Sequence, residues 1–175
     1  TKMVAERVFM SYSDKLKVHC IRPATVCGFS PRMRLDVAVN LLTFQALSRN
    51  QITVLGGSQV RPNIHIDDIT DLYLHLLSNM NSIPSGFYNA GFENISILDI
   101  AEMIKTKTDC EINIEKSNDP RSYRQDSAKI LETGFVPKKK VANAIDEIID
   151  AYKNKILKDT AQSHTVDWMK KNNIK

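Results

Sequence analysis

The stretch RPNIHIDD, at residues 61–68, is the part of the sequence that best indicates the fold class. Residues 63–66 have the character of a short strand, and a helix follows them directly. We expect Asp67 or Asp68 to cap this helix. Its expected core face consists of Ile69, Leu72, Tyr73, Leu76 and Leu77. A strand that runs straight into a helix is typical of an alternating α/β fold.

The same alternation continues on both sides of this stretch. Before it, the pattern predicts a helix over the first dozen residues, a strand at 16–21, a helix at 36–49 and a strand at 52–55. After it, the pattern predicts strands at 87–91 and 111–115. It also predicts three helices: one at 97–105, a short one that ends at Leu131, and one from Val141 to Tyr152. Ser96 and Asp99 form a near capping box for the helix at 97–105. Periodicity is weak after Leu157, so the sequence predicts no element there.

Composition places the chain among ordinary globular proteins. Its 175 residues are 42% hydrophobic and 25% charged, which is enough for one compact domain with a core. The net charge of +4 comes from scattered residues, apart from the short run at 138–140. Such a surface suits an anionic small ligand at least as well as a nucleic acid, and it lacks the basic stripe with interleaved aromatics of nucleic-acid-binding domains.

The cysteines and the apolar runs argue against several other classes. Cys20, Cys27 and Cys110 lie far apart and show no metal-ligand spacing, so we expect reduced thiols and no metal. No apolar run reaches the roughly 18–20 residues needed to cross a bilayer, and the first residues do not resemble a signal peptide. We therefore expect a cytoplasmic protein without membrane contact.

The segments TKMVAE at 1–6 and IRPATVCG at 21–28, followed in order by RPNIHIDD, resemble the extended short-chain dehydrogenases of the NAD-dependent epimerase/dehydratase family. That family carries a Tyr-x-x-x-Lys helix. The resemblance makes Lys2 the catalytic lysine and places the tyrosine four residues earlier, outside this sequence. Residues at i and i+4 share a helix face, so the ammonium can lower the phenol pKa and also bind the nicotinamide ribose.

The resemblance also assigns cofactor contacts to the end of the strand at 16–21. In the family this segment runs beside the nicotinamide, which implies cofactor-binding roles for Pro23, Ala24, Thr25 and Val26. Ligands of open α/β sheets bind at the carboxyl ends of strands, which agrees with this position. The family commonly has tyrosine where this chain has Cys27. Taken alone, without the resemblance, the segment is better interpreted as a buried strand leaving the core.

Substrate contacts are implied at three further places. Arg61, Arg121 and Arg124 correspond to arginines that face the nucleotide diphosphate, for which planar paired donors are well suited. Asn40 and Asp119 correspond to residues near the pyrophosphate, sugar or ribose. Alternatives remain open at this point, because Asn40 can be a core amide and the loop at 118–126 can be an exposed connection. For His65 we favour a buried histidine with a backbone partner.

The resemblance implies the C-terminal part of a Rossmann-type doubly wound parallel sheet plus a small α/β substrate-binding domain. We expect residues 1–60 to complete the Rossmann domain, 61–157 to bind nucleotide-sugar, and 158–175 to form a tail. The implied activity is an NAD- or NADP-dependent nucleotide-sugar epimerase or dehydratase, acting as a homodimer. A 4-keto-sugar nucleotide reductase and a non-catalytic nucleotide-binding member are the alternatives. No glycine-rich phosphate loop is present in the sequence, so we expect these 175 residues by themselves to be inactive.

Overall fold

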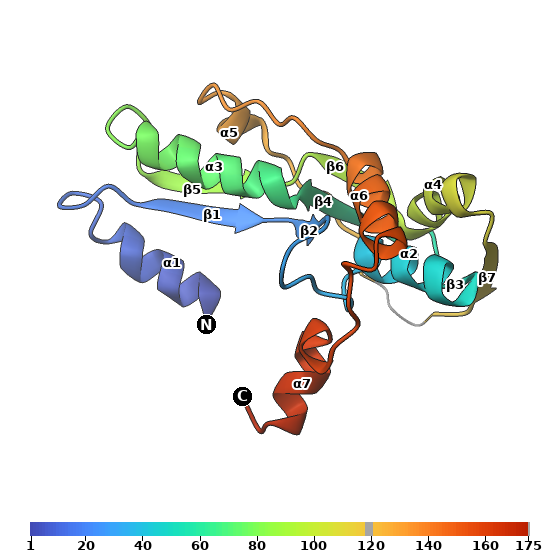
Figure 1. The fold of residues 1–175 in the computed structure, drawn as a ribbon. Helices are drawn as coiled ribbons and strands as arrows, with labels where there is room; N and C mark the ends of the chain where they lie inside the picture. The colour runs from blue at the N-terminus through green and yellow to red at the C-terminus, as the bar shows by residue number, and fades with distance from the viewer. Residues whose placement is uncertain (118–120, 175) are drawn as a thin grey trace.

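The computed structural model describes residues 1–117 and 121–174, and helices and strands alternate along them (Figure 1). The helices are α1 Lys2–Met10, α2 Ala38–Arg49, α3 Ile66–Ser78, α4 Ile97–Thr108, α5 Ala128–Leu131, α6 Val141–Lys153, the 3-10 turn Ala161–Ser163 and α7 Thr165–Lys171. The strands are β1 His19–Pro23, β2 Thr25–Cys27, β3 Gln51–Leu55, β4 Val60–His65, β5 Gly86–Ala90, β6 Glu93–Ser96 and β7 Glu111–Glu115. The predicted α/β class is confirmed.

Strand pairing is mainly parallel. β1 pairs with β5, β2 with β4, and β3 with β7, all in parallel, whereas β6 adds to β4 in the antiparallel direction. Parallel neighbours require a crossover, and each of these three crossovers contains at least one helix: α2 lies between β2 and β4, and α3 lies within the other two. In Figure 1, α3 and α1 lie on opposite sides of the β1 and β5 pair. Ala24 joins the two sheet regions, because its backbone N–H donates to the Ala90 carbonyl at 2.8 Å.

Two large apolar clusters form the core. The first packs α2, α4 and α6 against β3 and contains Ile52, Ile104 and Ile145, each fully buried. The second packs α3 and β5 together and contains Leu72 and Tyr88. Both clusters take side chains from each side of residue 60, since partly buried residues of β1 and β2 complete the second. The clusters are thus interleaved along the chain, and the predicted division at residue 60 stays a prediction.

The apolar pattern of α3 predicted its core face only in part. Ile69, Leu72 and Leu76 are buried, as expected, but Tyr73 is 50% and Leu77 is 62% exposed. Those two predictions were wrong, because positions four and eight residues after Ile69 drift around the helix, away from the narrow stripe that faces the sheet. In α1 every apolar residue remains outside the two large clusters, and Phe9 is 61% exposed.

The cap of α3 also differs from the prediction. His65 is the N-cap, and its Nδ1 accepts a hydrogen bond from the Asp67 backbone N–H at 3.1 Å. Asp68 caps nothing in α3; its buried carboxylate instead accepts from the backbone N–H groups of Lys138 and Lys139, at 2.9 and 3.0 Å. The near capping box of α4 is confirmed, since Ser96 Oγ accepts from the Asp99 N–H at 3.0 Å. His65 is buried with a backbone partner, as expected.

The C-terminal part contains an element that the weak periodicity did not predict. α7 projects away from the main body of the molecule (Figure 1). Two hydrogen bonds dock the C-terminal segment: the Leu35 N–H donates to the Ser163 carbonyl in the 3-10 turn at 2.8 Å, and the Val166 N–H in α7 donates to the Asp36 side chain at Oδ2, at 3.2 Å. Among residues 1–117 and 121–174, every helix is too short or too polar to cross a lipid bilayer.

Candidate functional site

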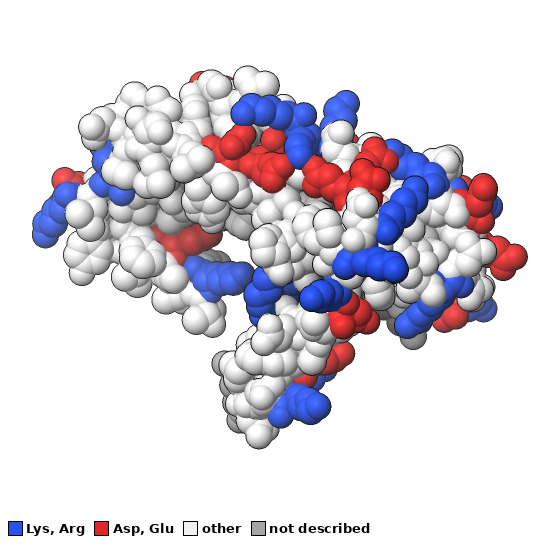
Figure 2. Space-filling view, in the orientation of Figure 1, with Lys and Arg blue, Asp and Glu red and all other residues white. Residues whose placement is uncertain are grey.

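A cavity of about 710 Å³ opens beside the N-terminus of α1, and we refer to it as the cavity. Six residues singled out by the sequence line it: Lys2, Pro23, Ala24, Thr25, Val26 and Arg124. They come from α1, from the end of β1 with the start of β2, and from the loop before α5, which are far apart in sequence. Figure 2 shows Lys and Arg side chains facing the hollow between α1 and α7.

The segment 23–26 reaches the cavity because of the sheet. β1 and β5 are parallel and end together, with Pro23 opposite Ala90. Pro23 closes the strand, and Ala24 then bonds to Ala90, so the chain turns into β2 at the carboxyl edge of the pair. Ligands of parallel sheets bind at this edge. The structure therefore places the predicted cofactor-binding segment where a ligand can reach it.

Lys2 is positioned by an ion pair between α1 and β1. Glu6, one turn further along the helix, accepts from Arg22 Nε at 2.9 Å and from Nη2 at 2.6 Å. Arg22 also lies over the Phe87 ring, 4.7 Å from its centroid. The hydrogen bonds from Arg22 hold the pKa of Glu6 below its usual value. This two-pronged contact keeps the start of α1, and with it Lys2, beside the segment 23–26.

The loop that carries Arg124 is held by side chains bonded to its backbone. Asn94 both accepts from the Gln125 N–H at 2.8 Å and donates to the Gln125 carbonyl at 3.1 Å. Ser127 Oγ accepts from the Gly91 N–H and donates to the Gly91 carbonyl, each at 2.9 Å. A Cβ at Gly91 would lie 2.7 Å from that of Ala24, so the close approach of the two segments requires glycine.

Arg61 and Arg121 lie next to the cavity without lining it. Arg61 Nη1 donates to the Val60 carbonyl at 3.0 Å and also to the Arg121 carbonyl. Its guanidinium lies 5.3 Å from the centroid of the Tyr123 ring, which does line the cavity. The structure thus places Arg61, on β4, in contact with the loop that carries Arg121 and Arg124. Asp119 lies outside the described residues.

Asn40 is buried, and both ends of its amide have backbone partners. Its Oδ1 accepts from the Gly28 N–H at 3.1 Å, and its Nδ2 donates to the Arg34 carbonyl at 2.9 Å. Asn40 therefore closes the loop between β2 and α2. Its predicted contact with substrate stays a prediction, and the structure gives it an additional role in shaping this loop.

The sequence did not single out several other residues that line the cavity. They are Arg34, Asn89, Tyr123, Gln125 and Asp126. Gln125 Nε2 donates to the Arg22 carbonyl at 2.8 Å, which ties its loop to the end of β1. For Arg34 a signal was available, because an arginine two residues before an acid in a loop bounded by glycine and proline can be held by that acid.

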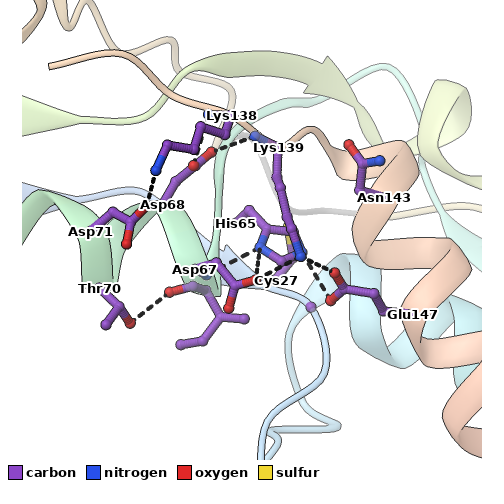
Figure 3. Close-up of polar contacts among 12 residues, drawn as sticks. Cys27, His65, Asp67, Asp68, Thr70, Asp71, Lys138, Lys139, Asn143 and Glu147 are labelled. Carbon is purple, nitrogen blue, oxygen red and sulfur yellow. Dashed lines mark hydrogen bonds and ion pairs between the residues drawn. The ribbon is translucent and has the colours of Figure 1, made fainter.

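A second group of charged residues lies away from the cavity, at the start of α3 and on α6. We call His65, Asp67, Lys139 and Glu147 the polar cluster (Figure 3). Because His65 Nδ1 accepts from a backbone N–H, its Nε2 carries the proton and donates to Glu147 Oε2 at 3.1 Å. The Lys139 ammonium lies 2.6 Å from Asp67 Oδ2 and 2.5 Å from Glu147 Oε1.

The polar cluster has the ligand types of a metal site. Ligand atoms of His65, Asp67 and Glu147 lie within 4.8 Å of one another. The Lys139 ammonium, however, already places a cation between the two carboxylates (Figure 3). The hydrogen bond that Lys139 donates to Asp67 lowers the pKa of Asp67, and the pKa of Lys139 is raised because Asp67 and Glu147 both accept from its ammonium. The cluster is therefore a structural network that links α3 to α6.

Comparison with known proteins shows the family of the chain. The profile of the NAD dependent epimerase/dehydratase family matches residues 1–91, which is 91 of the 175 residues. The chain belongs to this family. The match covers Lys2, the segment 23–26, Asn40 and Arg61, which are the predicted site residues of the first half of the chain.

One curated protein and two solved structures illustrate what the chain is similar to. CDP-paratose 2-epimerase of Salmonella typhi is 31% identical over 96 residues, covering 54% of this chain and 27% of that protein. The structure of UDP-glucuronic acid 4-epimerase from Bacillus cereus, in complex with UDP-glucuronic acid and NAD, is 25% identical, with a TM-score of 0.72. RMD from Pseudomonas aeruginosa, solved with NADPH, is 18% identical with a TM-score of 0.73, which shows the fold alone.

The extent of these matches matters for function. The Bacillus cereus comparison covers 87% of this chain but 51% of that enzyme, and the Pseudomonas comparison covers 87% and 55%. The chain thus spans about half the length of these solved relatives of the family. The fold of this chain is Rossmann-type, as the sequence predicted, because its structural neighbours share that fold.

Proposed function

We propose that the whole protein is an NAD- or NADP-dependent nucleotide-sugar epimerase or dehydratase. The observation that carries this proposal is the cavity, in which Lys2 meets the segment 23–26 and Arg124. Within residues 1–117 and 121–174, these groups come from three separate parts of the chain. Membership in the NAD-dependent epimerase/dehydratase family supports the same conclusion.

The lining of the cavity fits a dinucleotide and an anionic sugar nucleotide. It combines an ammonium at Lys2, guanidinium groups at Arg34 and Arg124, and the hydroxyl of Thr25. When bound, a nicotinamide cofactor supplies hydride transfer. Lys2 would hold the ribose of the cofactor, and its ammonium would lower the pKa of the tyrosine that the family pattern expects four residues earlier, the group that would take a proton from a sugar hydroxyl. Thr25 and the backbone of Pro23, Ala24 and Val26 would hold the carboxamide.

Substrate binding is assigned to the arginines of the adjoining loop. Arg124 faces the cavity directly, and Arg61 and Arg121 supply further positive charge beside it. Paired N–H donors fit the diphosphate of a nucleotide-sugar better than a point charge does. Asp119 is proposed to meet the sugar or the ribose, and Asn40 the pyrophosphate or the sugar. We propose that residues 61–157 mainly serve this substrate-binding part, with 1–60 completing the Rossmann part and 158–175 forming a tail.

The proposal extends to the assembly and location of the protein. α1 leaves Met3, Val4, Val8 and Phe9 more than half exposed. A row of exposed apolar residues on one helix supports a homodimer in which α1 contributes to the interface. The three free cysteines support a cytoplasmic location.

A panel of UDP-, GDP-, CDP- and dTDP-sugars offered to the whole protein with NAD or NADP tests the proposal. We expect at least one sugar to be epimerised or dehydrated, and Lys2→Met to lower kcat by about 100-fold or more. Lys15→Met, which changes an exposed lysine after α1, serves as the control and should stay within about twofold of wild type.

Other outcomes of the panel identify the alternatives. Turnover of 4-keto sugars alone, with consumption of NADPH, indicates a 4-keto-sugar nucleotide reductase. Binding without turnover of any sugar indicates a non-catalytic member of the family. If no nucleotide-sugar binds or reacts, the proposed function is wrong.

A further inference from the structure

The loop between β2 and α2 presents Arg34 to the cavity on a fixed backbone. Asn40, which is 2% exposed, accepts from the Gly28 N–H and donates to the Arg34 carbonyl. Both ends of the loop are thereby bound to one buried side chain. The position of the Arg34 backbone follows from this closure, but the direction of its long side chain does not.

Asp36 sets the direction of the Arg34 side chain. Arg34 Nε donates to Oδ1 at 2.8 Å and Nη2 donates to Oδ2 at 3.1 Å, which is the parallel, two-pronged geometry. A guanidinium carries five N–H donors, so this contact leaves three for a ligand. The Arg34 side chain is 45% exposed whereas that of Asp36 is 19% exposed, so the carboxylate is the anchored partner.

The anchor of Asp36 comes from the C-terminal segment. Val166, in the first turn of α7, donates its backbone N–H to Asp36 Oδ2 at 3.2 Å. The Leu35 N–H donates to the Ser163 carbonyl at 2.8 Å and holds the same two segments together. Burial alone would raise the pKa of Asp36, but its bonds with Arg34 and the Val166 N–H outweigh this and lower it. The carboxylate is therefore charged and held from both sides.

The contact between the two segments is incomplete. A second cavity of about 480 Å³ separates them, with Phe29 and Met33 on the loop side and Leu157 and Gln162 on the C-terminal side. Leu35 fills part of the interface and is 1% exposed. Among the contacts that dock the C-terminal segment, the one at Asp36 is also connected to the cavity, because Asp36 binds Arg34.

We propose that Asp36 is a positioning residue that connects the C-terminal segment to the cavity, holding Arg34 in the direction that receives an anionic group of the ligand. The identity of the ligand as a nucleotide-sugar rests on the proposed function; the connection between Val166, Asp36 and Arg34 does not. The 3-10 turn and α7 tune ligand affinity through this connection although they do not line the cavity.

Two substitutions test the connection in the full chain. Asp36→Asn removes the charge that aligns Arg34, and Val166→Pro removes the N–H donor within the first turn of α7, where proline is tolerated. Asp36→Glu retains the carboxylate and should keep part of the Arg34 alignment and of the ligand affinity that Asp36→Asn loses. Val166→Ala keeps the N–H, and Asp167→Asn changes a neighbouring acid of α7, so these two are the controls.

Two measurements are made on each variant. The Nε–H resonance of Arg34, assigned by its loss in Arg34→Lys, reports the alignment of the side chain through its hydrogen exchange rate. Calorimetric titration with UDP-glucuronic acid reports affinity. We expect Asp36→Asn to speed Nε–H exchange by about tenfold and to weaken affinity by about five- to thirtyfold. Val166→Pro should weaken affinity by about threefold, and both controls should remain within about twofold.

Unchanged exchange and affinity in Asp36→Asn would overturn the proposal. If that variant does not fold, Val166→Pro compared with Val166→Ala decides, and equal values for these two contradict the role of the C-terminal segment. If the wild-type protein does not bind UDP-glucuronic acid, the exchange of Arg34 Nε–H alone decides whether Asp36 positions the arginine, and the panel of nucleotide-sugars decides separately on the proposed function.

Discussion

The cavity and the polar cluster are both rich in charged residues, but they use charge in opposite ways. In the polar cluster the Lys139 ammonium contacts two carboxylates. Both ring nitrogens of His65 are hydrogen-bonded there, one to the Asp67 backbone N–H and the other to the Glu147 carboxylate. In the cavity, Lys2 and Arg124 line open space on exposed segments. The first arrangement stabilises the fold, and the second leaves donors available to a ligand.

This contrast shows why a perturbed pKa alone does not identify a functional site. The pKa of Asp67 is lowered and that of Lys139 is raised because Lys139 donates to the carboxylates of Asp67 and Glu147. The cavity is recognised instead by convergence of separate segments around a space that can hold a ligand. Substitutions in or beside the polar cluster should therefore lower the free energy of unfolding, whereas substitutions in the cavity should weaken ligand binding. The expected loss of stability decreases from Asp68, beside the polar cluster, through Lys139 and Asp67 to the cavity residues.

Removing the Asp68 carboxylate should have the largest effect. Asp68 is buried, and Asp68→Ala leaves the backbone N–H groups of Lys138 and Lys139 without their acceptor. This loss should lower the free energy of unfolding by about 2–4 kcal/mol. Urea unfolding measures the loss. Asp71→Ala is the control, because Asp71 is 40% exposed and its pair with Lys138 should contribute at most about 1 kcal/mol. Equal losses in the two variants would contradict this assignment.

Removing the cation of the polar cluster should have an intermediate effect. Lys139→Met leaves the Asp67 and Glu147 carboxylates without their shared partner and should lower the free energy of unfolding by about 1–2 kcal/mol, allowing for partial exposure. Lys138→Met is the matched control, since that side chain is 72% exposed. Should Lys139→Met be as stable as the control, the cluster would not act as a structural link.

The pH dependence of stability should reveal Asp67. Because the hydrogen bond from Lys139 lowers the folded pKa of Asp67, the stabilisation is present above the usual pKa of 3.8 and is lost as the pH falls through the folded value. We expect wild type to lose about 0.5–1 kcal/mol more than Lys139→Met between about pH 5 and about pH 3. Urea unfolding at both pH values measures the difference. Parallel losses in the two proteins would show that Asp67 does not respond to Lys139.

The cavity residues should contribute least to stability. Lys2→Met and Arg124→Met change exposed side chains and should alter the free energy of unfolding by less than about 0.5 kcal/mol. Binding of a nucleotide-sugar should nevertheless fall in both, as measured by calorimetry. A loss of stability comparable with that of Lys139→Met would remove the distinction between the two regions.

Much of the fold could be predicted because its signals are local. The helices α2, α4 and α6 and the strands β3, β5 and β7 follow from apolar spacing within a few residues. Ser96 announces α4 because a cap bonds to a group three residues away. The antiparallel addition of β6 to β4 and the parallel register of β3 with β7 were not predicted, since pairing partners lie up to 60 residues apart.

For the candidate site, the sequence supplied types of residue but not their arrangement. The order of motifs led to Lys2, the segment 23–26 and Arg124, and these do meet in one cavity. For Arg34 the neighbouring acid Asp36 was a local signal, but the hydrogen bond that holds Asp36 comes from α7, 130 residues away, and could not be predicted. His65 could be predicted as buried, but its pairing with Glu147, 82 residues later, could not.

The sequence by itself therefore determined the α/β class and the family, because hydrophobic period and motif order are properties of neighbouring residues. Only the tertiary structure decided which charges face a ligand and which neutralise one another. Coulomb energy and hydrogen bonding depend on distances of a few ångströms in space, and those distances are set by how the segments pack.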